Sequence, residues 1–158
     1  MKRLPFVAVV LALAGLLPFL LCTCGIVFFA SGVPVPNLMM AFVFYGAMSL
    51  GFYGAVHWGL ALEPAPVIVT TGADHTNRLR LALGVVPAFA GWVAAYTAFA
   101  WMPVAGVAIL ALAVPLLYLL ERQGWRTGAL PSGYMGLRLI VSAVTECCLL
   151  VVLVARLF

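Results

Sequence analysis

The sequence predicts an all-α integral membrane protein built as a bundle of five transmembrane helices. Of its 158 residues, 66% are hydrophobic and only 8% are charged, and the mean hydropathy is +1.23. A soluble globular protein of this length needs far more polar surface than this chain supplies. The apolar residues form long runs joined by short connections, with no internal repeat. We therefore expect residues 1–158 to form a single membrane domain.

The expected spans differ in their ends and in where proline interrupts them. The first contains Pro18, which removes a backbone donor and is expected to kink the helix in mid-membrane. Its apolar run is longer than the core of a signal peptide, so we expect it to remain as a helix. Pro103 separates the third span from the fourth, because a proline can end one helix and open the next. The spans are predicted at residues 4–30, 37–62, 78–100, 104–121 and 134–155.

Basic residues are distributed unevenly between the two ends of the predicted bundle. Arg156 alone lies on one side, and the other side carries Lys2, Arg3, Arg78, Arg80, Arg122, Arg126 and Arg138. By the positive-inside rule the N-terminus faces the cytoplasm, or a mitochondrial matrix, and the C-terminus faces the periplasm or its equivalent. This places the protein in a bacterial inner membrane, or in the mitochondrial inner membrane, as a multi-pass protein. Lipid headgroups and orientation explain the net charge of +4, so nucleic acid is not an expected partner.

The second span carries two series of residues at intervals of four. A step of four advances a helix by only about 40°, so each series forms a slowly drifting ridge, and the two ridges lie on roughly opposite faces. We expect the small residues to pack closely against another helix and the polar residues to form hydrogen bonds inside the bundle. The small series is Ala47, Gly51, Ala55 and Gly59, and the polar series is Tyr45, Ser49, Tyr53 and His57.

The fifth span repeats the same interval with polar side chains, including an acid deep in the membrane. If the second and fifth spans are antiparallel neighbours, residues at matching depth lie opposite one another, on rungs about 6 Å apart. We call this arrangement the polar ladder, and its expected pairs are His57 with Arg138, Tyr53 with Ser142, and Ser49 with Glu146.

Glu146 and Arg138 each leave alternatives open. An ionised carboxylate in mid-bilayer costs about 2.5–3.5 kcal/mol on insertion scales, so we expect Glu146 to be protonated or paired. Its simplest role, shared with Ser142 and Thr145, is to join helices by hydrogen bonds. Arg138 can extend to the headgroups or pair inward.

His57 could serve as a metal ligand, a proton relay or a polar anchor beside Trp58. It has no second histidine three or four residues away, and the four cysteines lack the spacing of a zinc site. The sequence also contains no HExxH, GxGxxG, Walker or nucleophile-elbow motif. We therefore predict no catalytic residues and no metal site.

Three stretches of the chain resemble the transmembrane protein 69-like family, a domain of unknown function in proteobacteria and mitochondria. They are YGAMSLGFYGAVHWGLAL, RLRLALGVVPAFAGWVAA and LPSGYMGLRLIVSAVTE, and the most specific elements are Val56-His57-Trp58-Gly59 and Leu137-Arg138. The family usually has leucine where Tyr53 stands, glycine at Ala55 and tryptophan at Gly133, so Tyr53 as a rung is particular to this chain. The resemblance implies an inner-membrane helical bundle and brings no established activity.

These observations favour a non-enzymatic protein that acts as an accessory, assembly or interaction subunit of a larger membrane complex. All connections are short, so most of the surface available for binding is helix surface. The expected partners are membrane lipid and other membrane subunits or further copies of the chain. The alternative is a bundle that binds or conducts protons, a quinone, a lipid or another small solute along the polar ladder. We predict no cofactor, although a bound lipid or quinone would fit this alternative. An enzyme acting on a lipid-soluble substrate would need a pocket near His57.

Overall fold

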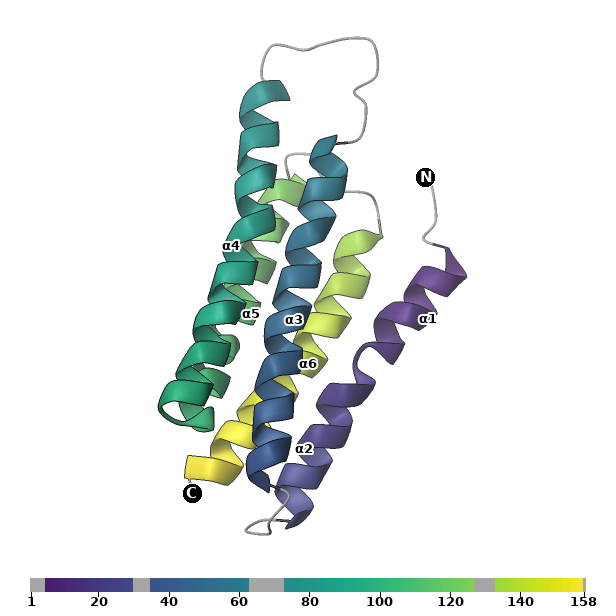
Figure 1. Cartoon of the computed structure of the whole chain (residues 1–158). Coiled ribbons are helices and arrows are strands. Elements are labelled where there is room, and N and C mark those ends of the chain that lie inside the picture. The colour runs from purple at the N-terminus through teal and green to yellow at the C-terminus, as the bar shows by residue number, and fades with distance from the viewer. Residues whose placement is uncertain (1–4, 30–34, 63–72, 127–132, 158) are drawn as a thin grey trace.

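The computed structural model describes residues 5–29, 35–62, 73–126 and 133–157. All regular structure in this part of the chain is helical, which confirms the predicted all-α class (Figure 1). The helices are α1 (Phe6–Ala14), α2 (Leu17–Phe29), α3 (Val35–Leu62), α4 (Ala73–Ala100), α5 (Pro103–Arg126) and α6 (Tyr134–Leu157).

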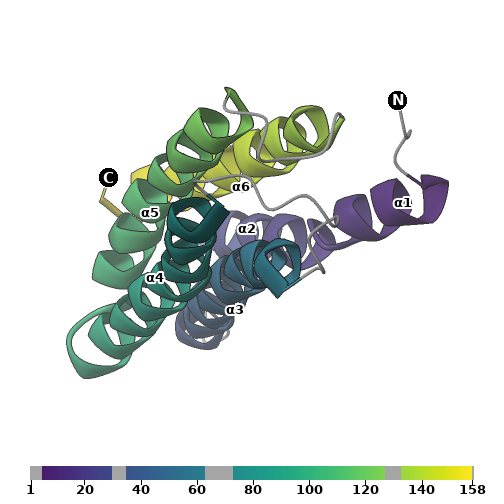
Figure 2. The same cartoon turned by 90° about the horizontal axis from the view of Figure 1, so that it is seen from above.

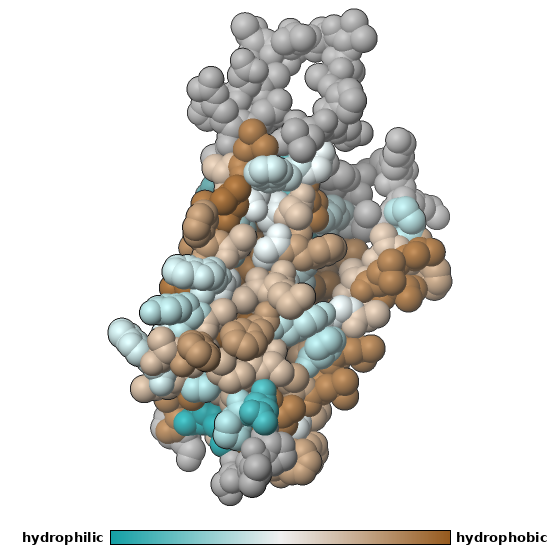
Figure 3. Space-filling model, in the orientation of Figure 1, coloured by the Kyte–Doolittle hydropathy of each residue, from teal (hydrophilic) through white to brown (hydrophobic). Residues whose placement is uncertain are grey.

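The hydropathy of these helices is that of a multi-pass membrane protein. Within the described residues, α4 has a shorter apolar stretch, Gly84–Ala100, because its first turns carry the polar sequence ADHTNRLR. The space-filling view is brown or tan over much of its described surface, as expected for helices that face acyl chains (Figure 3). The segments long and apolar enough to cross a membrane are Phe6–Phe29, Val35–Gly59, Pro103–Gln123 and Tyr134–Leu157.

The packing order of the helices differs from the predicted one. α3 packs along α4, and α5 packs against α6, while α2 and α5 each contact both α3 and α6. α3 and α6 therefore lie diagonally across the bundle, and the prediction that these two spans are direct neighbours is wrong. Intervals of four show which residues share a face of one helix, but they do not show which helix that face meets.

The first span is broken into two helices, and α1 leans away from the bundle (Figures 1 and 2). The break lies at Gly15 and Leu16, ahead of the kink predicted at Pro18. Pro18 is accommodated in the first turn of α2, where its missing N–H is not needed, so the preceding helix ends before it. The Tyr45 hydroxyl donates a 2.7 Å hydrogen bond to the Gly15 carbonyl, which the break leaves without its helical partner. The bond satisfies the Gly15 carbonyl, which could not find a hydrogen-bond donor among the acyl chains.

α2 is held much more firmly than α1. Phe19 is buried between α2 and α3, with its ring centroid 5.6 Å from that of Phe42 and 5.0 Å from that of Tyr45, both in edge-to-face contact. At the other end of α2, the Arg156 side chain of α6 donates a 2.8 Å hydrogen bond from Nη2 to the Ile26 carbonyl. α1, in contrast, contains no buried residue. The first span therefore has one half fixed in the core and one half on the outside.

The contact between α3 and α4 depends on glycines at which the two backbones touch. A Cβ added to Gly91 would lie 2.7 Å from the Ala47 carbonyl oxygen. A Cβ added to Gly54 would overlap the carbonyl oxygen of Gly84. Any larger residue at Gly54 or Gly91 would force the helices apart, because backbone atoms cannot rotate out of the way.

The predicted ridge of small residues follows this contact for only part of its length. Gly51 lies in it, with a built Cβ position 3.9 Å from the Cβ of Ala88. Ala55 and Gly59, however, are exposed, and no described atom lies within 4 Å of a Cβ built on Gly59. A ridge with a strict step of four drifts around the helix, so the contact moves to Gly54 after a step of three.

We predict that Gly91→Ala lowers the free energy of unfolding by about 1–3 kcal/mol, the usual cost of forcing an extra group into a tight contact. Gly136→Ala on α6 is the matched control, because a Cβ there meets no described atom within 4 Å. It should be neutral or slightly stabilising, since alanine favours helix more than glycine. Thermal unfolding in detergent measures both. Equal midpoints for the two variants would contradict the close contact between α3 and α4.

Candidate functional site

A buried ionic cluster joins three helices near the end of the bundle where α6 begins. Glu121 of α5 is 0% exposed, and His57 of α3 and Arg138 of α6 are each 3% exposed. Arg138 Nε donates a 2.7 Å hydrogen bond to Oε2 of Glu121, and His57 Nε2 lies 3.4 Å from Oε1 of the same carboxylate. An ionised carboxylate only accepts hydrogen bonds, so this contact is a hydrogen bond when Nε2 of His57 carries a hydrogen.

Tyr53 holds the other side of the arginine. The Arg138 Cζ lies 3.8 Å from the centroid of the Tyr53 ring, in a cation–π contact. The guanidinium is therefore fixed by a carboxylate at its Nε and by an aromatic face below its plane. α3 and α6 do not pack directly, but these long side chains connect them across the bundle.

The apolar stripe of α5 explains why a carboxylate is buried here. Val107, Leu110, Val114 and Leu117 are buried core residues at intervals of three and four, and Glu121 continues the series four residues later. On α6, Arg138 lies on the buried face between Met135 and Val141. Both charges therefore occupy positions that the helical period assigns to the interior.

Several donors of the cluster make no hydrogen bond within the described residues. Nη1 and Nη2 of Arg138 and the hydroxyl of Tyr134 are buried and have no hydrogen-bond partner. Buried polar groups in proteins are nearly always paired, so these donors can take a partner that the described residues do not supply. Arg138 and Tyr134 are one helical turn apart on α6 and lie on the same face.

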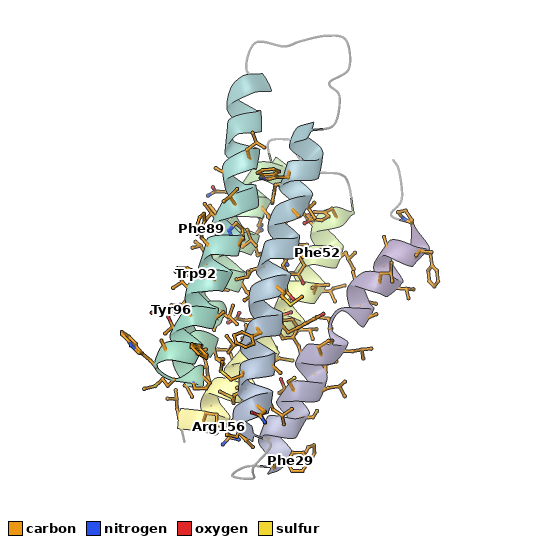
Figure 4. All side chains as sticks on the ribbon, viewed as in Figure 1. Phe29, Phe52, Phe89, Trp92, Tyr96 and Arg156 are labelled. Atoms are coloured by element: carbon orange, nitrogen blue, oxygen red, sulfur yellow. The ribbon has the colours of Figure 1, made fainter. Side chains whose placement is uncertain are left out.

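A cavity of about 400 Å³ lies beside these donors, between α1, α3 and α6. This volume is within the range of roughly 300–1,000 Å³ that small-molecule sites occupy. Tyr134, Arg138 and Tyr53 line it. Met48 and Phe52 line it as well and are also exposed on the outer surface, so the cavity opens sideways toward the acyl chains. Figure 4 labels Phe52 on α3.

Of the polar ladder, the structure brings together only the residues near the end of the bundle where α6 begins. His57 and Arg138 meet through Glu121, and Tyr53 contacts Arg138 where Ser142 was expected. The longest side chains can reach across a diagonal pair of helices, and the shorter ones cannot.

The lower part of the ladder is not assembled. Ser49 Oγ donates a 2.8 Å hydrogen bond to the Tyr45 carbonyl of its own helix. The Ser142 hydroxyl and Oε2 of Glu146 are buried, with no hydrogen bond to any described residue. The expected pairs Tyr53 with Ser142 and Ser49 with Glu146 are therefore not formed in the described structure.

Glu121 and Tyr134 belong to the site but are not among the residues predicted from the sequence. Glu121 lies at the predicted end of the fourth span, where Arg122 and a polar loop follow it. Its interval of four from Leu117 was the available signal, since that spacing continues the apolar stripe. Arg138 pairs inward with it and does not extend to the headgroups. Within the described residues no three His, Cys, Asp or Glu side chains come together in a way that could hold a metal ion.

We predict that Arg138→Met alone destabilises the protein by about 3–5 kcal/mol, because it leaves the Glu121 carboxylate buried without its cation. The double variant Glu121→Gln with Arg138→Met should recover much of that loss, since both charges are then removed. Arg122→Gln, at an exposed neighbouring position, is the control and should have little effect. Unfolding in detergent measures all of them. A double variant less stable than Arg138→Met would contradict the pairing.

Comparison with known proteins places these residues in a family. The family model described as "Protein of unknown function (DUF3429)" matches residues 4–154, a range that includes His57, Glu121 and Arg138. Transmembrane protein 69 of Xenopus tropicalis is 30% identical over 145 residues, which make up 91% of this chain and 52% of that protein. The chain thus spans about half the length of this curated relative. No solved structure matches the chain. Because the match covers nearly the whole sequence, the chain belongs to the DUF3429, transmembrane protein 69-like family of membrane proteins.

Proposed function

We propose that the protein is a non-enzymatic membrane protein that binds a small lipid-soluble molecule in the cavity between α1, α3 and α6. The observation that supports this proposal is the position of Arg138, which lines the cavity and whose two terminal nitrogens are buried and unpaired within the described residues. An apolar cavity with a few converging polar groups is the usual form of a small-molecule site.

The position of the opening gives the ligand its route. Leu11, Met48 and Phe52 are exposed on the outer surface and line the cavity, so a ligand enters from the hydrocarbon region of the membrane. Its apolar part can lie against Val56, Leu137 and Val141. This makes a lipid or a quinone a more suitable occupant than a water-soluble molecule.

The orientation in the membrane is part of the same proposal. α1 and α2 together form one crossing and α4 forms another, which gives five crossings with α3, α5 and α6. The end of the bundle where α1 begins faces the cytoplasm or a mitochondrial matrix, because it carries seven of the eight basic residues. The ionic cluster then lies toward the inner leaflet of a bacterial or mitochondrial inner membrane.

A cavity-filling variant tests the binding function. Ser49→Trp places a large ring in the cavity, and the Ser49 hydroxyl bonds only to its own helix among the described residues. Ala55→Trp, exposed on the same helix, is the matched control. We expect wild type and Ala55→Trp to retain a lipophilic molecule after mild purification, and Ser49→Trp to retain much less. Mass spectrometry of the intact complexes measures this. Equal retention by the two variants, or none by wild type, would refute the proposal.

We also propose that the protein is an accessory, assembly or interaction subunit, and the exposure of α1 favours this role. Phe6, Val7 and Leu11 are all exposed, and α1 packs mainly against α6. A helix with so little contact to its own bundle leaves most of its surface available to a second membrane chain or a second copy. Membrane lipid covers whatever that partner does not.

Purification in a mild detergent tests the accessory role. We expect a particle larger than the 16.8 kDa chain, containing a second chain or a second copy in constant ratio. Val7→Asn places a polar group on the exposed face of α1 and should dissociate the particle. Phe99→Asn, on the exposed face of α4, should leave it intact. A strictly monomeric wild-type particle would argue against an accessory role.

A further inference from the structure

We infer that the molecule bound in this cavity has an uncharged head carrying carbonyl-type acceptor oxygens, held by Arg138 and Tyr134, and an apolar tail that leaves between α1 and α3. This inference rests on the proposed binding function of the cavity and specifies the chemical class of the ligand.

The hydrogen-bonding state of the cavity wall identifies which groups can bind the head. The Tyr45 hydroxyl is already donated to the Gly15 carbonyl, and the Ser49 hydroxyl is donated to the Tyr45 carbonyl. Arg138 Nε is taken by Glu121, which leaves Nη1 and Nη2. Together with the Tyr134 hydroxyl, these nitrogens are buried donors without partners among the described residues. Since a guanidinium only donates hydrogen bonds, the ligand atoms that meet it must be acceptors.

The charge of the cluster argues against an anionic head. The Arg138 guanidinium is already balanced by the Glu121 carboxylate at 2.7 Å, so this ion pair carries no net charge. A phosphate or carboxylate head would bring a further negative charge to a pair that is already neutral. Uncompensated charge is strongly unfavourable in an apolar environment, whereas a neutral carbonyl oxygen satisfies the same donors without adding charge.

The remaining walls suit a neutral, partly flat molecule. Phe52 and the ring of Tyr53 contribute aromatic surface, and Met48 contributes a flexible apolar side chain at the opening. Arg138 and Tyr134 are lining residues with buried, unpaired donors, whereas Met48 and Phe52 are lining residues that are exposed on the outer surface. A ligand therefore enters with its polar head first, and its tail remains among the acyl chains.

Two sources share this chemistry: lipid-soluble quinones, with ring carbonyls, and neutral glycerolipids, with ester carbonyls. The test measures binding of a decyl-substituted benzoquinone and of dioctanoylglycerol to the full-length protein in detergent. Decylbenzene, which has no acceptor oxygen, and oleate, at a pH where its carboxylate is ionised, are the comparison probes. We expect a carbonyl probe to bind more tightly than both, and the better of the two carbonyl probes identifies the source.

Tyr134→Phe is the deciding variant, because it removes one unpaired donor and keeps the ring. We expect it to weaken binding of the preferred carbonyl probe by about three- to tenfold, the usual effect of one hydrogen bond. Decylbenzene binding should not change. Tyr96→Phe, on the exposed face of α4, is the control and should leave all binding unchanged.

The outcomes separate this inference from the function on which it rests. Tighter binding of oleate, or no effect of Tyr134→Phe, overturns the assignment of the head and leaves the cavity as a binding site, provided that Ser49→Trp still abolishes binding. Probes that bind wild type and Ser49→Trp equally overturn the cavity function and this inference together.

Discussion

The bundle is organised around the buried carboxylate of Glu121. Glu121 lies where α3, α5 and α6 converge, and it accepts contacts from His57 and Arg138, which belong to two helices that do not pack directly. A charge inside a membrane protein has to be balanced by the protein itself. Here the Glu121 charge is balanced by side chains from helices on opposite sides of the bundle. α3 and α6 are therefore linked by long side chains and not by close contact of their backbones. The cavity lies next to that link.

The broken first span completes the arrangement. Phe19 fixes α2 in the core, whereas α1 turns outward after Gly15 and borders the cavity without contributing a buried residue. A straight helix would not need the Tyr45 hydroxyl, because the Gly15 carbonyl would accept a bond from its own helix. The same tyrosine thus stabilises the break and lines the space beside it. Tyr45 and Gly15 therefore have two roles, because they stabilise the break in the first span and also line the cavity.

The sequence was sufficient for the class of fold and for the approximate bounds of most helices, because long apolar runs in a chain with so few charges admit few alternatives. It was not sufficient for helix neighbours. Intervals of four grouped His57 with Tyr53 and Arg138 with Ser142 and Glu146, but they could not show that α5 supplies the carboxylate between the two groups. Gly54 and Gly91 were missed for a related reason, since a contact between antiparallel helices alternates steps of three and four. The burial of Glu121 could not be predicted either, because an acidic residue followed by Arg122 is typical of the polar end of a membrane span.

The order of the cluster residues along the chain has a consequence for biosynthesis. His57 and Glu121 precede Arg138 in the chain, so α3 and α5 leave the ribosome before α6, which carries the strongest partner of the acid. Until α6 packs against α5, Glu121 lacks the Arg138 guanidinium that contacts it in the folded bundle. Insertion of α6 supplies that cation and the remaining wall of the cavity at the same moment. The ionic cluster and the cavity are thus completed in the same step of assembly.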